Sequence, residues 1–488
     1  MKRRKTMNNF LNALSNTTYT ENGSLAYKST LSPVYDMFGL AAAYRNRSDA
    51  DCIQLFSNAL QTDVAHAMKC LFYTRNIRGG QGERRYFRVC YKWLAKNHRD
   101  IALRNMEYIP DFGRWDDLFC LFGTTLETEM LNFIKAQLAL DVQEKNPSLL
   151  AKWMPSLNAS SHETRTMANR IRHFLGWTAK QYRKTLSILR ARIRLVETDM
   201  SQNNWGEIEF GKLPGKACYK YRKAFLRHEG SAERYAAFAT NKDAKVHAST
   251  IYPYECVKEA RDCRWHGTET DRAMANKRWD SLTDYFNGAS FDAIAVVDVS
   301  GSMTCGAVSV APIDVAISLG LYCADKARGP FANHFITFSE RPRLVQVRGD
   351  NFVDKVNNME RADWGYNTDL ESVFNLLLDT AVRTKCSQED IPSKLLIVSD
   401  MQIDCSSRGP VSNVIECCRK RWAAAGYAMP DLVYWNVNAV RDTFLDNDPY
   451  ATYISGCSPA ILNQLMTGKT GIELMLGVLD SDTYAMIG

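Results

Sequence analysis

The chain lacks the features of a membrane-spanning or disulfide-linked protein. Its 488 residues contain no run of about eighteen uncharged apolar residues, the length that a transmembrane helix needs. The fourteen cysteines include no Cys-x-x-Cys pair, so their spacing does not support a zinc or redox motif. Because most of these cysteines stand in apolar stretches, we expect buried thiols in a reducing compartment, and therefore a cytoplasmic protein.

A secretory signal and low-complexity tracts are also missing. The first residues, MKRRKTMNNFLNALSN, are basic but contain no apolar core followed by small residues. We therefore expect residues 1–30 to form a flexible segment rather than a signal peptide. The chain exceeds the size at which a single core keeps growing, so we expect two domains, 31–288 and 289–488.

Acidic residues are scarce in the first part of the chain. Residues 1–290 hold 45 Lys and Arg against 30 Asp and Glu, a net charge of +15. Residues 291–488 hold 16 against 24, a net charge of −8, and the whole chain carries +7. A basic half joined to an acidic half indicates a polyanionic partner for the basic half.

Two basic segments contain no acid at all. Residues 164–196 carry nine Lys or Arg and residues 211–228 carry six, interleaved with aromatic residues. Basic side chains neutralise phosphates, and aromatic rings stack on unpaired bases, so this pattern favours nucleic acid over the alternative of a solvated helix face. The candidate RNA-binding residues are Arg165, Arg170, Arg172, Lys180, Arg183, Lys184, Arg190, Arg192, Arg194, Lys212, Lys216, Lys220, Arg222, Lys223 and Arg227. The interleaved aromatics are Trp177, Tyr182, Tyr219, Tyr221 and Phe225.

The spacing of apolar residues divides the chain into two fold classes. Between about 35 and 290, apolar residues recur at steps of three and four, which predicts helix after helix in an α-solenoid or bundle. After 290, short apolar strands alternate with amphipathic helices, which is typical of a mostly parallel sheet covered by helices. The expected strands lie in 291–300, 333–339, 393–401 and 431–439, and the expected helices in 311–327, 367–382 and 411–426.

Oxygen-bearing side chains follow two of the expected strands. Asp298, Ser300 and Ser302 come directly after the strand in FDAIAVVDVSGSM, and Asp400 ends the strand in LLIVSDMQ. Thr368 lies in a loop between them. Ligands of such sheets bind beyond the carboxyl ends of the strands, so we expect these oxygens to converge. Two carboxylates and three hydroxyls suit Mg²⁺, or another divalent cation such as Mn²⁺ or Ca²⁺, with one position left for an acid from a partner.

This arrangement resembles the von Willebrand factor type A domain and its metal-ion-dependent adhesion site. Asp298, Ser300 and Ser302 match the first motif of that site, Thr368 the second and Asp400 the third. One departure is Met401, where many such domains have glycine. The resemblance implies a Rossmann-like α/β fold for residues 289–488 and a metal site formed by these five residues.

The two-part organisation resembles the TROVE architecture of the Ro autoantigen, and more closely an uncharacterised family of cellular and viral proteins. The matching stretches are 75–87 (RNIRGGQGERRYF), 112–118 (FGRWDDL), 194–217, 337–345, 398–402, 434–439 and 455–462. For TROVE proteins the resemblance implies HEAT-like helical repeats, arranged as a ring or horseshoe, that bind single-stranded or structured small RNA. The expected fold is therefore multidomain, α followed by α/β.

Two short motifs have structural explanations. The glycines of IRGGQGERR could expose amides to a phosphate, but we favour a turn between helices with Arg78 and Arg84 on the RNA-binding surface. FGRWDDL predicts a tight turn docked by Trp115, with Asp116 or Asp117 capping the next helix.

No nucleophile motif joins the eight histidines to a serine or cysteine, so we expect no enzymatic activity. Two functions remain open. The first is a ribonucleoprotein component whose basic helices bind RNA. The second is a scaffold in which the metal takes an Asp or Glu from a partner protein, including the role of a viral assembly or virion component.

Overall fold

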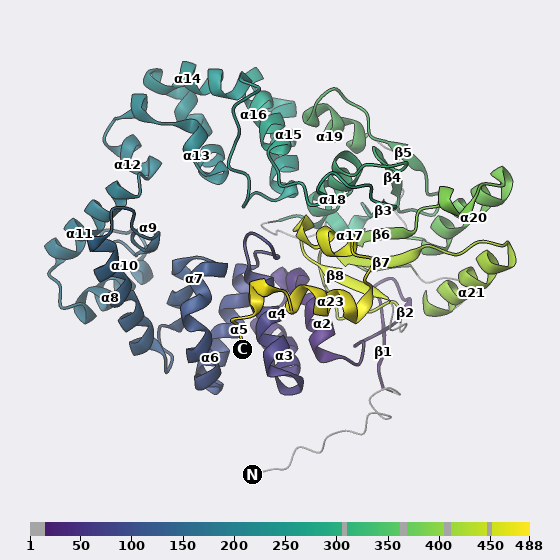
Figure 1. The fold of residues 1–488 in the computed structure, drawn as a ribbon, viewed down its shortest axis with the longest axis horizontal. Coiled ribbons are helices and arrows are strands. Elements are labelled where there is room, and N and C mark those ends of the chain that lie inside the picture. The colour runs from purple at the N-terminus through teal and green to yellow at the C-terminus, as the bar shows by residue number, and fades with distance from the viewer. Residues whose placement is uncertain (1–14, 305–309, 362–367, 405–410, 447–450) are drawn as a thin grey trace, which may run out of the picture.

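The computed structural model describes residues 15–304, 310–361, 368–404, 411–446 and 451–488. Helices dominate the chain up to residue 280 and follow one another along an arc (Figure 1). They are α2 (Pro33–Leu40), α3 (Asp49–Thr62), α4 (Val64–Arg75), α5 (Arg84–Asn97), α6 (Arg99–Asn105), α7 (Ile109–Phe112), α8 (Glu127–Gln143), α9 (Leu150–Trp153), α10 (His162–Phe174), α11 (Ala179–Arg192), α12 (Val196–Ser201), α13 (Gly215–Arg227), α14 (Glu229–Thr240), α15 (Pro253–His266) and α16 (Glu269–Asp280). Short 3₁₀ turns connect several of them, including η1 (Ala41–Asn46) and η3 (Trp115–Leu121).

Local sequence explains where several of these helices begin. Ser48, Thr178 and Thr268 start α3, α11 and α16 with capping boxes, in which the side chain accepts from a backbone amide of the first turn. Asp63 does the same for α4 through the amide of His66. These caps satisfy amides that have no partner within the helix.

The C-terminal part is a six-stranded sheet in the order β5-β4-β3-β6-β7-β8. Every neighbouring pair is parallel except β4 and β5. The strands are β3 (Ala293–Val297), β4 (His334–Thr337), β5 (Leu344–Gln346), β6 (Lys394–Ser399), β7 (Asp431–Asn436) and β8 (Thr452–Ser455). The helices are α17 (Gly301–Thr304), α18 (Pro312–Lys326), α19 (Phe352–Glu360), α20 (Leu370–Thr384), α21 (Val411–Ala424), α22 (Leu462–Leu465) and α23 (Gly471–Leu479).

The structure confirms the two fold classes, helical first and then a mostly parallel sheet with helices. The four expected strands correspond to β3, β4, β6 and β7. The edge strands β5, of three residues, and β8, of four residues, were not predicted.

The N-terminal segment differs from the expected flexible tail. Residues 17–27 form an antiparallel hairpin of β1 (Thr17–Tyr19) and β2 (Leu25–Tyr27). The hairpin packs against the C-terminal part, where Tyr27 and Phe444 exchange backbone hydrogen bonds of 2.8 and 2.9 Å. The first 14 residues of the expected segment lie outside the described part of the chain.

The start of the helical arc covers the β8 edge of the sheet. The Tyr35 hydroxyl of α2 donates to the Ala451 carbonyl at 2.8 Å and accepts from the Tyr453 amide at 2.9 Å. The Ala439 amide donates to the Ala43 carbonyl at 3.1 Å. Tyr35 therefore completes hydrogen bonds that the edge strand would otherwise leave to solvent, and the turn η1 contacts the segment after β7.

The end of the arc packs on α18 and α19 of the same domain. Trp279 of α16 stacks on Phe352 of α19 with ring centroids 4.2 Å apart, and its indole donates to Asp325 of α18 at 2.6 Å. Arg261 of α15 pairs with Asp314 and Glu360. Both ends of the arc thus contact the α/β domain, and the elements form a closed ring (Figure 1).

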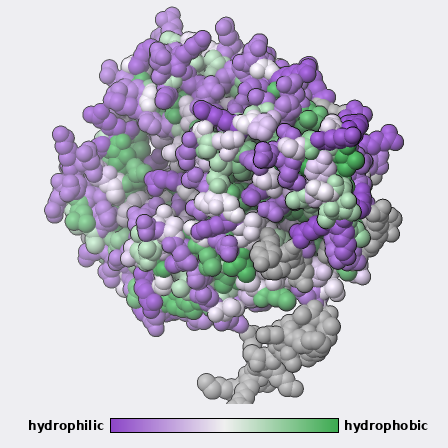
Figure 2. Space-filling view, turned by 45° about the vertical axis from the view of Figure 1, so that its right-hand side comes forward, coloured by the Kyte–Doolittle hydropathy of each residue, from purple (hydrophilic) through white to green (hydrophobic). Residues whose placement is uncertain are grey.

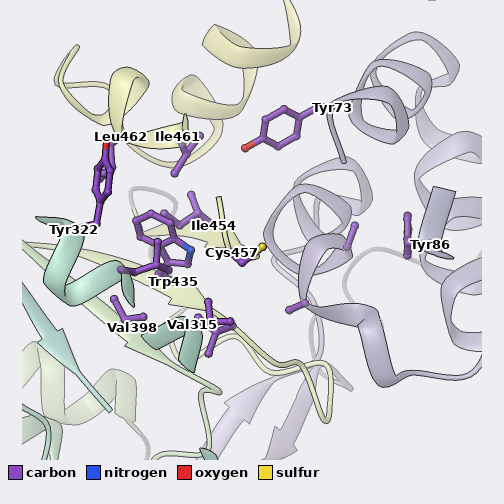
Figure 3. Packing of buried hydrophobic residues seen from close by; sticks show 14 of the residues in the cluster. Tyr73, Tyr86, Val315, Tyr322, Val398, Trp435, Ile454, Cys457, Ile461 and Leu462 are labelled. Carbon is purple, nitrogen blue, oxygen red and sulfur yellow. The ribbon is translucent and has the colours of Figure 1, made fainter. Parts of the chain in front are cut away.

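One continuous apolar core runs from the helices into the sheet. Figure 3 shows a part of it, with Trp435 and Val398 from the sheet, Tyr322 and Val315 from α18, Ile461 and Leu462 from the C-terminal segment, and Tyr73 and Tyr86 from α4 and α5. Burial of apolar surface contributes roughly 25 cal/mol per Å², so this shared core stabilises the association of the two parts.

The glycine-rich stretch lies at the junction where the ring closes. It forms the turn between α4 and α5, as expected, and Arg78 and Arg84 are exposed. Gln81 is buried and accepts from the Ser458 amide at 3.3 Å. Gly82 has φ +69°, and a Cβ there would overlap the Tyr252 hydroxyl at the start of α15. The glycine is therefore needed for close approach between the two ends of the arc.

The FGRWDDL motif forms a turn built around a buried ion pair. Asp117 is fully buried and accepts from the Arg75 guanidinium at 2.6 Å and from the Arg114 amide at 2.9 Å. Asp117 therefore caps η3, as expected for one of the two aspartates. Trp115 stacks on Phe133 with ring centroids 5.5 Å apart.

In the part of the chain that the structure describes, no helix combines the length and apolarity that crossing a membrane requires. Figure 2 shows a face covered mostly by hydrophilic side chains, with hydrophobic ones scattered among them.

Replacing Gly82 by Ala tests the ring closure. We expect Gly82→Ala to lose about 1–3 kcal/mol more stability than Gly123→Ala, because overpacking against Tyr252 adds to the strain of a positive φ. Gly123 is the matched control, since it has φ +74° and no described atom lies within 4 Å of the point where its Cβ would stand. Equal losses in chemical denaturation would contradict a tight contact at this junction.

Candidate metal site and nucleic-acid interface

Asp298 and Asp400 lie next to each other at the carboxyl edge of the sheet. β3 and β6 are parallel neighbours with Val297 opposite Val398, and the Asp298 amide donates to the Val398 carbonyl at 3.0 Å. Both aspartates are at most 1% exposed. The parallel pairing therefore gathers two carboxylates that are 102 positions apart in a sequence of 488 residues.

Asp298 is held by its own loop and by the neighbouring strand. Its Oδ1 accepts from the Ser300 amide at 2.8 Å, and its Oδ2 accepts from the Ser399 hydroxyl at 2.5 Å. Burial raises the pKa of Asp298, and the nearby Asp404 carboxylate raises it further, against the lowering effect of these hydrogen bonds.

Asp400 has a buried oxygen that no hydrogen bond satisfies. Its Oδ1 accepts from the Gln402 amide at 3.2 Å, whereas its Oδ2 has no hydrogen-bond partner among the described residues. Burial, and then repulsion from Asp298, raise the pKa of Asp400 to about 7, and the Ser302 hydroxyl nearby lowers it. An orphaned buried carboxylate oxygen costs free energy unless a proton or a cation compensates it.

The predicted hydroxyl ligands Ser300, Ser302 and Thr368 make different contacts at the carboxyl edge of the sheet. The Ser300 and Ser302 hydroxyls lie 3.1 Å apart and share a hydrogen bond. Thr368 is buried, and its hydroxyl donates to the Gln402 carbonyl at 3.2 Å. Thr368 therefore contacts the loop that follows Asp400. The preceding residues of its motif, 364–367, lie outside the described part of the chain.

Met401 adopts a backbone conformation that favours glycine. Its φ is +63°, in the left-handed region, and its amide donates to the Ser399 hydroxyl at 3.0 Å. At this position many of the von Willebrand factor A domains that the sequence resembles have glycine. The turn forms with methionine, at the energetic cost of a strained residue, about 1–3 kcal/mol.

Several contributors to this edge were not predicted from the sequence. Ser399 orients Asp298, and Asp404 accepts from the Thr368 amide at 2.8 Å. Gln402 is buried and contacts both Asp400 and the N-terminal hairpin. The hairpin carries no recognisable motif, so only the fold reveals that it lies here.

The donor set fits a hard divalent cation. Two carboxylates, with the Ser300 and Ser302 hydroxyls beside them, offer only oxygen atoms, as Mg²⁺ prefers. Within the described ranges, no group of three or more His, Cys, Asp or Glu side chains is placed to hold a metal. A cation at this edge would therefore depend on hydroxyl and water ligands as well as on Asp298 and Asp400.

The basic residues of α11 form an exposed face. Lys180, Arg183 and Lys184 are exposed and stand at positions three and four apart, so they lie on the same side of the helix. None of the three side chains makes a hydrogen bond or ion pair with another described residue. We call these residues the α11 face. Its cations are available to phosphates.

Other predicted RNA-binding residues are engaged within the protein. Arg190 is half-buried and donates to the Ala151 and Met154 carbonyls, both at 2.8 Å. Internal partners are also held by Arg165, Arg170, Arg172, Arg192, Lys212, Lys216, Arg222 and Arg227. Arg78 donates to a backbone carbonyl, and Lys220 lies over the Tyr221 ring. Arg84, Arg194 and Lys223 are exposed and, like the α11 face, form no side-chain hydrogen bond or ion pair with a described residue.

The interleaved aromatics divide between core and surface. Tyr182 and Phe225 are buried at 1% and 0% exposure, so they belong to the core. The Tyr182 hydroxyl donates to the Pro155 carbonyl at 2.8 Å. Trp177, Tyr219 and Tyr221 are half-buried. Of the five, only these three keep ring surface that a base could contact.

These features define a class of protein, one with a helical arc closed by an α/β domain. The crystal structure of the Deinococcus radiodurans Ro (RSR) protein has a similar fold, with a TM-score of 0.50 over 92% of this chain and 99% of that one, at 12% identity. The chain therefore has a Ro-like fold, as its resemblance to TROVE proteins predicts.

The chain belongs to the family described as "domain of unknown function (DUF2828)", whose model matches residues 20–140 and 161–289. A second model, "domain of unknown function (DUF7788)", matches residues 292–476. The uncharacterized protein L728 of Acanthamoeba polyphaga mimivirus is 29% identical over 96% of this chain and 88% of its own length. The expected link to an uncharacterised family with viral members agrees with these matches.

The raised pKa of Asp400 predicts a pH dependence of stability. With chelator present, the folded protein holds a proton on Asp400 up to about pH 7, whereas the unfolded chain releases it near 3.8. The raised pKa of Asp400 therefore contributes to the stability of the folded state in full below pH 3.8. This contribution is lost as pH rises through about 7.

We expect Asp400→Asn, which keeps the shape and removes the charge, to raise the melting temperature at pH 8 more than at pH 5. Asp379→Asn, at an exposed position of α20, serves as control. A stability difference between Asp400→Asn and the parent that does not change with pH would argue against the burial of an unpaired carboxylate.

Proposed function

We propose that this protein is a non-catalytic, Ro-like RNA-binding protein whose basic helices hold single-stranded or structured small RNA. The observation that carries this function is the α11 face, where three neighbouring cations lack partners in the described structure. Unpaired, exposed cations on one helix face neutralise phosphates at no cost in internal ion pairs. RNA is the polyanion that this function assigns to the basic half.

The fold supports this function. The crystal structure of the Deinococcus Ro protein has a similar fold, and the resemblance to TROVE proteins implies RNA binding. The half-buried rings of Trp177, Tyr219 and Tyr221 lie in the two acid-free segments, where they offer surface for stacking on bases.

We further propose that the C-terminal domain is a von Willebrand factor A-type domain with a Mg²⁺ site of Asp298, Ser300, Ser302, Thr368 and Asp400. The unsatisfied Oδ2 of Asp400 supports this site, because a cation would supply the missing partner. A bound cation would offset the repulsion between two buried carboxylates. Neighbouring groups orient the two carboxylate ligands: the Ser399 hydroxyl donates to Asp298, and the Gln402 amide donates to Asp400.

The same site supports a second function, that of a metal-dependent scaffold for protein partners, including viral assembly. An adhesion-type site engages partners through an acidic side chain on the cation. In either function the protein acts in the cytoplasm and catalyses no reaction. Its basic and acidic halves bind different partners.

Charge reversal of the α11 face tests the RNA function. For the triple variant Lys180→Glu, Arg183→Glu and Lys184→Glu, we expect affinity for a labelled single-stranded RNA to fall at least about tenfold. The slope of log affinity against log salt should shrink by roughly two, since about 0.7 counterions are released per phosphate contact. Fluorescence polarisation over a salt series measures both quantities.

The matched control reverses three exposed cations of the acidic half, Arg341, Arg383 and Lys385. This control should bind RNA with an unchanged salt slope, and both variants should keep the parent melting temperature. If the control loses as much affinity as the α11 variant, net charge rather than the α11 face determines binding.

Calorimetric titration with Mn²⁺ tests the metal site. We expect one binding site in the parent protein, absent in Asp298→Asn and in Asp400→Asn but present in Asp379→Asn. RNA affinity should be unchanged in all three. Mn²⁺ binding that survives both substitutions would place the cation elsewhere.

A further inference from the structure

A groove with a volume of about 660 Å³ lies along α5, where this helix meets α3, η3 and α10. Pockets that hold ligands in proteins occupy about 300–1,000 Å³, so the groove is large enough for a bound group. Its lining includes no residue of the α11 face and none of the five predicted metal ligands. We call it the α5 groove.

The floor of the α5 groove is apolar and partly aromatic. Trp93 of α5, Phe119 of η3 and Met167 of α10 line it, and all three are half-buried. Trp93 packs edge to face on Phe56, with ring centroids 6.0 Å apart, so its ring is anchored while part of it stays exposed. Aromatic rings of this kind stack on unpaired bases of single-stranded nucleic acids.

One rim of the groove is a row of cations. Arg84, Arg88, Lys92 and Lys96 follow one another at four-residue steps along one side of α5, about 6 Å apart along the helix axis. Lys92 and Lys96 are exposed, and neither side chain forms a hydrogen bond or ion pair with a described residue. Both lysines line the groove, so their charges are available to a bound anion.

Most of the acidic charge in the groove is already neutralised within the protein. Of the three acids that line it, Asp116 pairs with Arg88 at 2.8 Å and Asp49 pairs with Arg85. Among the described residues, only Glu163 of these three acids has no ion pair. The two free lysines therefore leave the groove with a positive surplus, which favours an anionic occupant.

The groove adjoins the basic segment that the proposed function assigns to RNA. Met167 on its floor belongs to the first acid-free segment, 164–196, and α10 is followed directly by α11 with its exposed cations. A single strand bound at the α11 face thus has a second place to bind nearby in the sequence. This continuity and the aromatic floor favour RNA over an acidic peptide as the occupant.

We propose that the α5 groove is a second RNA-binding site, which takes an unpaired nucleotide. The base stacks on the floor formed by Trp93, Phe119 and Met167, and the neighbouring phosphates pair with Lys92 and Lys96. This inference rests on the proposed RNA function and goes further, because it assigns a contact with a base and selects single-stranded segments. A strand that reaches both sites gains affinity from their linkage.

Fluorescence polarisation of the full-length protein with labelled oligouridine tests the rim. For the double variant Lys92→Glu and Lys96→Glu, we expect affinity to fall about tenfold and the salt slope to shrink by roughly 1.4, since about 0.7 counterions are released per phosphate contact. The matched control reverses two exposed cations of the acidic half, Arg383→Glu and Lys385→Glu. This control should bind like the parent.

Phe119→Leu tests the floor, because leucine keeps an apolar side chain and removes the ring. We expect this variant to lose about fivefold in affinity for oligouridine and nothing for an abasic strand with the same number of phosphates. Its melting temperature should stay close to that of the parent. Equal affinity of the parent for oligouridine and for the abasic strand would overturn the stacking of a base.

The outcomes separate this inference from the RNA function itself. If charge reversal of the α11 face weakens RNA binding and the Lys92 and Lys96 variant does not, the RNA function stands and the role of the α5 groove is wrong. If an oligoglutamate peptide displaces oligouridine as well as unlabelled oligouridine does, the groove binds acidic peptides and the inference is overturned. If the parent binds no RNA, both proposals fail together.

Discussion

The rest of the structure depends on the contact between the α/β domain and both ends of the helical arc. At one end, Tyr35 of α2 hydrogen bonds to the backbone around β8; at the other, Trp279 of α16 stacks on Phe352 of α19. Where the ends meet, Gly82 lies so close to Tyr252 that no side chain fits between them. The domain therefore acts as the closing segment of a ring, and both parts share one apolar core.

The same arrangement of the ring places the N-terminal hairpin beside the candidate metal site. The hairpin reaches the loop after Asp400 because the chain enters the ring along the C-terminal domain, so residues 20–22 lie beside residues 402–404. Parallel pairing of β3 and β6 brings Asp298 and Asp400 together, and burial leaves one oxygen of Asp400 without a partner among the described residues. The acidic edge and the basic α11 face belong to different elements, which agrees with separate partners for the two halves.

Sequence patterns predicted the features that arise from local periodicity and strand ends. Buried runs such as 294–297 and 394–398 identified the central strands, and the side chains after them identified the carboxylate pair. Contacts between residues far apart in the sequence left no such pattern. The position of the hairpin at the site, the hydrogen bond from Ser399 to Asp298, and the edge strands β5 and β8 all depend on tertiary packing. The sequence therefore predicted more free basic side chains in the acid-free segments than the structure has. Arg190 and Arg192, for example, donate to backbone carbonyls.

In the proposed function, the basic helices of a closed ring hold RNA. Its most direct test is ultraviolet crosslinking of the full-length protein in the cells that express it, followed by mass spectrometry of the crosslinked peptides. RNA should copurify, and crosslinks should concentrate in α10 to α13, residues 162–227, including the α11 face. Protein free of nucleic acid, or crosslinks confined to residues 291–488, would contradict it.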